Sequence, residues 1–178
     1  SFSPLQMTKY LAMVANGGKP IDVSIIKTIR KPDGTEASKE EINNFVNQKL
    51  GITEEQTEDL NINEQNLDAI RQGMKSVTSD TTGTAYVRFR DFGIEVGGKT
   101  GSAEAGTDEN GKDIVHAWFA GYAPFEDPEI AIVVMVENGG HGNYTAEVVR
   151  DIMQEYFGMN TQDVQEDMSA QSYLQSLR

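Results

Sequence analysis

Residues 92–102 read Phe-Gly-Ile-Glu-Val-Gly-Gly-Lys-Thr-Gly-Ser, and this stretch decides the fold. An apolar run leads into two glycines, and Lys99-Thr100-Gly101-Ser102 follows. The same letters fit two structures with different chemistry, a phosphate-binding loop and a strand that lines a ligand site. The surrounding sequence has to decide between them.

The phosphate-loop interpretation rests on residues 93–100, which fit the pattern G-x-x-x-x-G-K-[ST]. Such a loop needs a helix N-terminus directly after the lysine and the hydroxyl residue. Residues 101–111 contain three glycines and no helical apolar period, so no helix is expected there. Glu95 would also bring a negative charge beside the phosphates. The run 130–137 resembles an acidic, magnesium-holding strand, so a nucleotide-binding protein stays as an alternative.

The strand interpretation uses every unusual residue of the stretch. The glycines before Lys99 allow another segment's backbone to approach closely, and Gly101 lets a ligand lie along the strand edge. Lys99 supplies a fixed positive charge. Thr100 and Ser102 are two residues apart, so on a strand they present two hydroxyls to one carboxylate. Taken alone, however, the short motif also fits an incidental lysine in a glycine-rich bend.

The composition describes one acidic domain without cysteine chemistry. The 178 residues are 38% hydrophobic, which is enough for a core. A net charge of -13 argues against a nucleic-acid partner, which would need a basic face. The absence of cysteine excludes disulfides, thiolate zinc sites and a cysteine nucleophile. We find no membrane span or signal peptide, and the start at Ser1 indicates a piece of a longer protein.

The first part of the chain predicts a helix, a strand and an acidic excursion. Ser3 is expected to cap a helix beginning at Pro4, with Gln6 completing a capping box. Its apolar stripe consists of Leu5, Met7, Leu11 and Val14, and it stops at residues 16–18. Residues 21–31 are β-branched and end in a turn, so they predict a strand. Residues 36–66 are interpreted as a solvated, partly helical excursion over the surface.

The second part predicts a helix, three strands and a final helix. The first helix is expected near Leu67, with Ile70 and Met74 on the same face. Strands are predicted over 89–103, 115–123 and 130–137, the last buried on both faces. Thr145 is expected to cap the last helix, which ends at Gly158. The inward residues of that helix would be Val148, Val149, Ile152, Met153 and Phe157.

This order of elements predicts an α/β (α+β) fold in which the last three strands form an antiparallel meander. Residues 1–158 would belong to one domain part, and the polar residues 159–178 to a C-terminal tail that frays. Trp118 is expected in the core.

Other candidate groups fit their chemistry poorly. Ser24 and Lys27 have S-x-x-K spacing, but that motif needs a helix N-terminus and these residues fall in a predicted strand. Ser3 and Ser102 have no general base at a usable spacing. We predict no metal and no cofactor, because the histidines and the polar residues of the hairpin loop lack ligand spacing. These residues are His116, His141, Asp108, Asn110 and Asp113.

Several segments, in the right order, resemble the transpeptidase domain of penicillin-binding proteins. Lys99-Thr100-Gly101 matches the family's K-T-G motif, and residues 116–124 and 130–138 resemble the two strands after it. Residues 3–18 resemble the helix after the second catalytic motif. Residues 67–77 and Gly83-Thr84-Ala85 resemble the segment leading into the K-T-G strand. The likeness covers most of residues 1–158 and is nearest to the monofunctional, class B enzymes that cross-link peptidoglycan.

The resemblance implies the penicillin-binding and serine β-lactamase type of fold and an acyl-transfer reaction. A serine attacks the penultimate D-Ala carbonyl of a stem peptide, and an amine of a neighbouring stem takes the acyl group. Lys99 would orient and charge the site, and Thr100, Gly101 and Ser102 would bind the substrate and its carboxylate. The Ser102 N–H would be one oxyanion donor. Gly97 and Ser102 stand where the family often has Ala and Thr, and both keep the needed groups.

The family's nucleophile motif and its S-x-N motif are missing ahead of the Pro4 helix. The attacking serine is therefore expected on an upstream half, and this chain alone is expected to be inactive. The resemblance implies that upstream half, stem peptides, β-lactams and cell-wall synthesis proteins as partners. It also implies a location at the extracytoplasmic face of the bacterial membrane, anchored by a segment outside this chain. A non-catalytic β-lactam sensor is a further alternative. Without its other half, the sheet would expose an apolar face.

Overall fold

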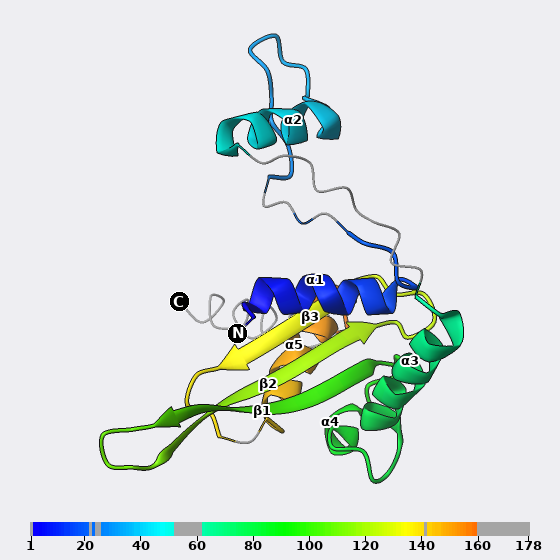
Figure 1. Cartoon of the computed structure of the whole chain (residues 1–178). Coiled ribbons are helices and arrows are strands. Elements are labelled where there is room, and N and C mark those ends of the chain that lie inside the picture. Colours follow the sequence, from blue (N-terminus) through cyan, green and yellow to red (C-terminus); the bar gives the residue numbers. More distant parts are fainter. Residues whose placement is uncertain (1, 22, 24–25, 52–61, 141, 160–178) are drawn as a thin grey trace, which may run out of the picture.

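The structure is a computed structural model that describes residues 2–21, 23, 26–51, 62–140 and 142–159. Its elements are α1 (Pro4–Ala15), α2 (Lys39–Leu50), α3 (Glu64–Ser79), α4 (Tyr86–Phe89), β1 (Gly97–Thr107), β2 (Asp113–Ala123), β3 (Ile130–Val136) and α5 (Thr145–Tyr156). Figure 1 shows helices on both faces of one sheet, which confirms the α/β (α+β) class. The predicted tail, apart from Met159, lies outside the described residues.

The strands form an antiparallel meander in the order β1-β2-β3, as predicted. The connection between β1 and β2 is shorter than expected, because the strands run on until only residues 108–112 join them. The strand predicted over 89–103 is wrong at its start. Residues 86–89 form α4, and β1 begins only at Gly97. The buried rings of Phe89 and Phe92 pack edge to face at 5.6 Å, a contact that favours a compact turn over an extended strand.

Buried side chains cover the sheet on its two faces. On one face α4 and α5 contribute Phe89 and Met153, and the ring of Phe89 stacks on Phe119 of β2 with 5.8 Å between centroids. On the other face α1 contributes Leu11, which packs in a cluster with Tyr122 of β2. The middle strand therefore carries the largest buried rings of the sheet.

The start of α1 is confirmed, and its apolar stripe is confirmed in part. The Ser3 hydroxyl accepts from the Gln6 N–H, and the Ser3 N–H donates to Gln6 Oε1 at 2.8 Å, which completes the capping box. Leu11 and Val14 are buried, but Leu5 is 56% exposed. At 100° per residue, Leu5 lies roughly 120° around the helix from Leu11, so it cannot face the same surface.

The buried faces of α5 and α3 are narrower than the sequence predicts. Val149 of α5 is fully buried, whereas Val148 and Ile152 are 41% and 42% exposed. In α3 Leu67 is buried, whereas Ile70 is 47% exposed. An apolar residue is covered only where another element lies over it, and the described chain covers one side of each helix.

Three further expectations about strands are wrong. In the described part of 21–31 no strand forms, and a single bridge joins Arg30 to Glu36, since β propensity alone does not hold a segment extended without a partner strand. The side chains of β3 are half-buried along its whole length, because β3 is an edge strand of the described sheet. Trp118 is also half-buried, since it lies opposite Gly101, which has no side chain to cover it.

Residues 26–51 form an arm, which Figure 1 shows standing away from the sheet. The arm consists of a turn at residues 31–35 and the helix α2. Ser38 and Glu41 form the capping box of α2, and Gly51 ends the helix with a φ of 64°. Ile42 is buried but belongs to neither core cluster of the sheet.

Candidate active site

The predicted site residues lie together at the start of β1, on one edge of the sheet. β1 pairs with β2 on one side only, so within the described residues its outer edge has no strand partner. An edge strand offers a row of free backbone N–H and C=O groups to an extended ligand. Residues 97–107 continue as strand without a helix after Thr100, so the geometry required by the phosphate-loop alternative does not form.

The two glycines before Lys99 have a structural reason. A Cβ on Gly97 would lie 2.5 Å from the ring of Tyr122, and a Cβ on Gly98 would lie 2.6 Å from Phe119. The close approach that the sequence indicates is therefore made by aromatic side chains of β2, and not by another segment's backbone. These glycines let β1 lie directly over the buried rings.

Lys99 is exposed, and no acidic side chain of the described residues pairs with it. Its ammonium group donates a hydrogen bond to the carbonyl oxygen of Thr100 at 2.6 Å. The ion pairs found among the described residues do not include Lys99. A positive charge is therefore available at the strand edge for an anionic ligand.

Thr100 and Ser102 lie on the same face of β1, opposite to the face from which Lys99 starts. Their partners across the ladder are Phe119 and Ala117, whereas Lys99 lies opposite Ala120. The long lysine side chain nevertheless brings its Nζ back to the Thr100 backbone. The Thr100 hydroxyl lies 2.9 Å from that of Thr84 in the loop between α3 and α4. Ser102 is exposed.

The helix α3 holds the start of β1 through residues that the sequence did not single out. The Thr78 hydroxyl donates to the carbonyl oxygen of Val96, and Lys75 forms an ion pair with Glu95 at 2.8 Å. The hydrogen bond to Glu95 raises the pKa of Lys75 above its ordinary 10.5. Both contacts join residues far apart in sequence, so no local sequence pattern predicts them.

The loop before α5 lies against the β1–β2 ladder beside the site. A Cβ on Gly142 would lie 2.5 Å from the carbonyl oxygen of Gly101, so only glycine fits there. Thr145 does not cap α5 as predicted: Tyr144 takes the N-cap position, and the buried Thr145 hydroxyl donates to the Gly142 carbonyl. His141, which was not expected to bind a metal, lies outside the described residues.

The described ranges offer no better site of another kind. They contain no cluster of three or more His, Asp or Glu side chains able to hold a metal ion. No helix in the same ranges is long and apolar enough to cross a bilayer. A cavity of about 390 Å³ lies between α3, α4 and residues 93–96, but none of the residues from Lys99 to Ser102 lines it. The open edge of β1 is therefore the strongest candidate site.

Comparison with known proteins identifies the family. The sequence matches the profile of the penicillin binding protein transpeptidase domain over residues 1–154. Penicillin-binding protein H of Bacillus subtilis is 33% identical over 141 residues, which cover 76% of this chain and 18% of that protein. The peptidoglycan D,D-transpeptidase MrdA of Haemophilus influenzae is 31% identical over 111 residues, which cover 55% of this chain and 17% of that protein.

A solved structure gives the same family. PBP2 of Pseudomonas aeruginosa, in complex with WCK 5153, matches with a TM-score of 0.67 at 29% identity, covering 87% of this chain and 30% of that one. The chain thus spans less than a third of the length of each of these relatives. Since the family profile covers residues 1–154, the chain belongs to the penicillin-binding protein transpeptidase family.

Proposed function

We propose that this chain is the C-terminal part of the transpeptidase domain of a class B peptidoglycan D,D-transpeptidase. The observation that carries the proposal is the edge of β1, which has no strand partner among the described residues. Lys99, which makes no ion pair within that part of the chain, and the hydroxyls of Thr100 and Ser102 come from neighbouring positions on it. The relative from H. influenzae is named a peptidoglycan D,D-transpeptidase, which supports the same reaction.

The reaction is acyl transfer through a serine that lies outside this chain. The serine oxygen attacks the carbonyl of the penultimate D-Ala, the peptide bond breaks, and the terminal D-Ala leaves with a proton on its amine. An amine of a neighbouring stem peptide then attacks the acyl-enzyme ester and releases the serine. β-Lactams take the place of the donor and stall at the ester.

This chain would supply the wall that holds the donor. The stem peptide lies along the free edge of β1 as an added strand, and Gly101 leaves room for it. Thr100 and Ser102 donate their hydroxyl hydrogens to the terminal carboxylate, and Lys99 attracts the same charge. The Ser102 N–H serves as one oxyanion donor, and the N–H of the absent serine as the other.

The same proposal implies the partners and the location of the whole enzyme. The upstream half of the domain would complete the site, and cell-wall synthesis proteins would be partners of the whole enzyme. The enzyme would work at the extracytoplasmic face of the membrane, where peptidoglycan is built. Residues 36–66 would be a surface excursion of the domain.

Acylation by fluorescent penicillin tests the proposal in the longer protein that contains this chain. We expect the longer protein to be labelled and the 178-residue chain alone to remain unlabelled. K99A should lower the acylation rate roughly 100-fold, the size expected when a preorganised polar contact is removed. The matched control, K112A in the exposed turn after β1, should react like the wild type.

Two labelling results would contradict the proposal, and a second assay separates it from the sensor alternative. An unlabelled longer protein would refute the enzymatic function, and labelling of the chain alone would refute the external nucleophile. Release of D-Ala from a D-Ala-D-Ala peptide distinguishes a transpeptidase from a β-lactam sensor, which would be acylated without releasing D-Ala.

A further inference from the structure

Thr84 lies beside the proposed ligand site, and an inference about its role rests on the proposed function. It lies between α3 and α4, in a segment beside the start of β1, where Figure 1 shows both helices next to that strand. Its hydroxyl lies 2.9 Å from the hydroxyl of Thr100, although the two residues are 16 positions apart. Within the described residues the Thr84 hydroxyl makes no other hydrogen bond.

The segment around Thr84 is held firmly while its side chain stays exposed. A Cβ on Gly83 would collide with the carbonyl oxygens of Ser76 and Val77, so the backbone of α3 packs directly on this glycine. The Ala85 N–H donates to the Val77 carbonyl at 3.0 Å, and Ala85 is 1% exposed. Both neighbours of Thr84 are thus fixed, and the threonine is presented to β1.

The direction of the shared hydrogen matters for ligand binding. Each threonine hydroxyl has one hydrogen to donate and two lone pairs that accept. An ionised carboxylate only accepts, so a ligand carboxylate needs the hydrogen of Thr100. That hydrogen is free only when Thr84 donates to Thr100, and not the reverse.

We propose that Thr84 is a positioning residue for the carboxylate of the ligand. Its hydroxyl donates to Thr100 Oγ, fixes the Thr100 rotamer and leaves the Thr100 hydrogen directed at the carboxylate. A chain of two hydrogen bonds results, from Thr84 to Thr100 and from Thr100 to the ligand, in which the first polarises the second. Thr84 itself touches neither the ligand nor the reacting atoms.

The test compares a β-lactam that carries a free carboxylate with one that does not. In the longer protein, acylation rates are measured with penicillin G and with its carboxyl methyl ester, for wild type, T84V and T84S. T84V should lower the rate with penicillin G by up to roughly 10-fold, the upper size of one hydrogen bond between neutral groups. The rate with the ester should change by less than about twofold, and T84S should restore the rate with penicillin G.

A matched control is T107V, which removes an exposed threonine hydroxyl at the far end of β1 and should change neither rate. An unchanged rate of T84V with penicillin G would overturn the inference, and so would an equal loss with both compounds, because that indicates a structural role. If wild type does not react with penicillin G, the proposed function fails and the inference fails with it. If wild type reacts and T84V shows no carboxylate-specific loss, the inference alone fails.

Discussion

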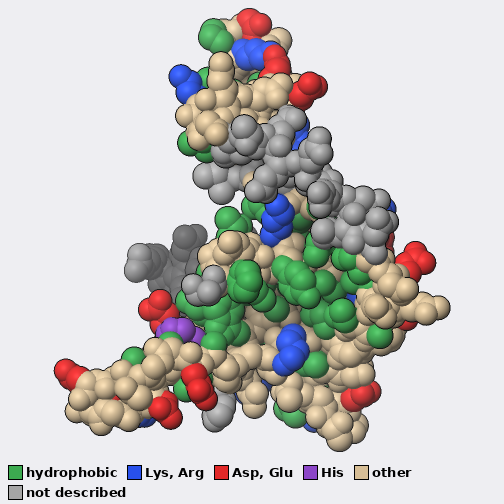
Figure 2. Space-filling view, viewed as in Figure 1, with side chains coloured by type: hydrophobic (Ala, Val, Ile, Leu, Met, Phe, Trp, Pro, Cys, Tyr) green, Lys and Arg blue, Asp and Glu red, His purple; other side chains and the backbone are tan. Residues whose placement is uncertain are grey.

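The sheet with its helices and the arm at residues 26–51 are stabilised in different ways. The sheet carries two clusters of buried side chains, in which Phe119 and Tyr122 are fully buried. In the arm Ile42 is buried, whereas Phe45 and Leu50 are 55% and 68% exposed. Figure 2 shows hydrophobic side chains gathered on the body below the arm.

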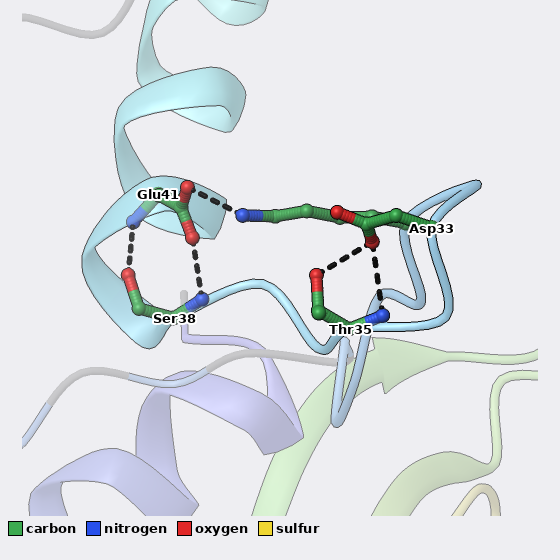
Figure 3. Close-up of polar contacts among 5 residues, drawn as sticks. Asp33, Thr35, Ser38 and Glu41 are labelled. Carbon is green, nitrogen blue, oxygen red and sulfur yellow. Dashed lines mark hydrogen bonds and ion pairs between the residues drawn. The ribbon is translucent and has the colours of Figure 1, made fainter.

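The arm is held mainly by polar contacts between residues close in sequence. Figure 3 shows the Asp33 carboxylate accepting from the Thr35 hydroxyl at 2.7 Å, and Ser38 and Glu41 bonding reciprocally. Lys31 also pairs with Glu41 at 2.7 Å. Exposed contacts of this kind contribute at most about 1 kcal/mol each. The candidate site therefore lies on the part of the molecule that has a core, and we expect the arm to unfold while that core stays folded.

The largest difference should come from removing one aromatic ring in each part. F119A leaves a cavity under β1 and should lower the free energy of unfolding of the full chain by about 3–5 kcal/mol. F45A, the matched change in the arm, should stay within about 0.5 kcal/mol because that ring is exposed. Urea unfolding followed by circular dichroism measures both. Equal effects would show that the arm shares the core.

The next prediction compares two Gly→Ala changes, one limited by lack of space and the other by an unfavourable backbone conformation. G98A places a methyl group against Phe119 and should destabilise the chain by about 1–3 kcal/mol. G34A in the arm meets open space, but Gly34 has a φ of 84°, which costs an alanine about 1–2 kcal/mol. We expect G98A to lower the global unfolding midpoint and G34A only to loosen the turn. If both variants lowered the midpoint equally, the arm and the sheet would not unfold as separate units.

Two equivalent capping boxes give the third test. S3A and S38A each remove an N-cap hydroxyl, which stabilises a helix by about 1 kcal/mol. S3A should lower the global stability because α1 packs on the sheet, whereas S38A should speed hydrogen exchange in α2 alone. Faster exchange throughout the sheet in S38A would contradict the comparison.

The smallest effect is a loss of stability of the arm in acid. The hydrogen bond from Lys31, together with the Ser38 backbone, lowers the pKa of Glu41 below its ordinary 4.5. The Thr35 hydroxyl and backbone likewise lower the pKa of Asp33 below 3.8. Both stabilising contributions are therefore present above those ordinary values and are lost as the pH falls through the lower folded-state values.

Hydrogen exchange of α2 and α1 below about pH 4.5 measures this difference. The capping box of α1 uses Gln6, which does not titrate, so α1 should keep its protection while α2 loses part of its own. E41Q is the control, because it removes the ionisable carboxyl group of the α2 capping box. The hydrogen-exchange protection of α2 in this variant should change less with acid. Parallel losses in α1 and α2 would refute the local origin of the effect.

Much of the fold was predictable from the sequence because its signals are local. The capping box of Ser3 and Gln6 spans a single helical turn, and the three apolar runs of the second part predict the meander. The wrong predictions about the buried faces of the helices share one cause. Whether Leu5, Ile70 or Val148 is buried depends on which element lies over it, and periodicity within one helix does not contain that information.

The candidate site also has one part that the sequence predicts and another that it does not. The sequence alone brings Lys99, Thr100, Gly101 and Ser102 together, because they are consecutive on one strand. It does not place Thr84 against Thr100, Gly142 against Gly101, or Lys75 beside Glu95. Those contacts join separate elements, and their partners are selected only when the whole core has packed.

By itself, therefore, the sequence determined the motif, the strand that carries it, the helix cap of α1 and the family. The tertiary structure alone decided which edge of the sheet is open, which apolar faces are covered and which hydroxyl lies beside Thr100. The physical reason is range: caps, turns and periodicity act over a few residues, whereas burial and long-range hydrogen bonds depend on the packing of the entire chain.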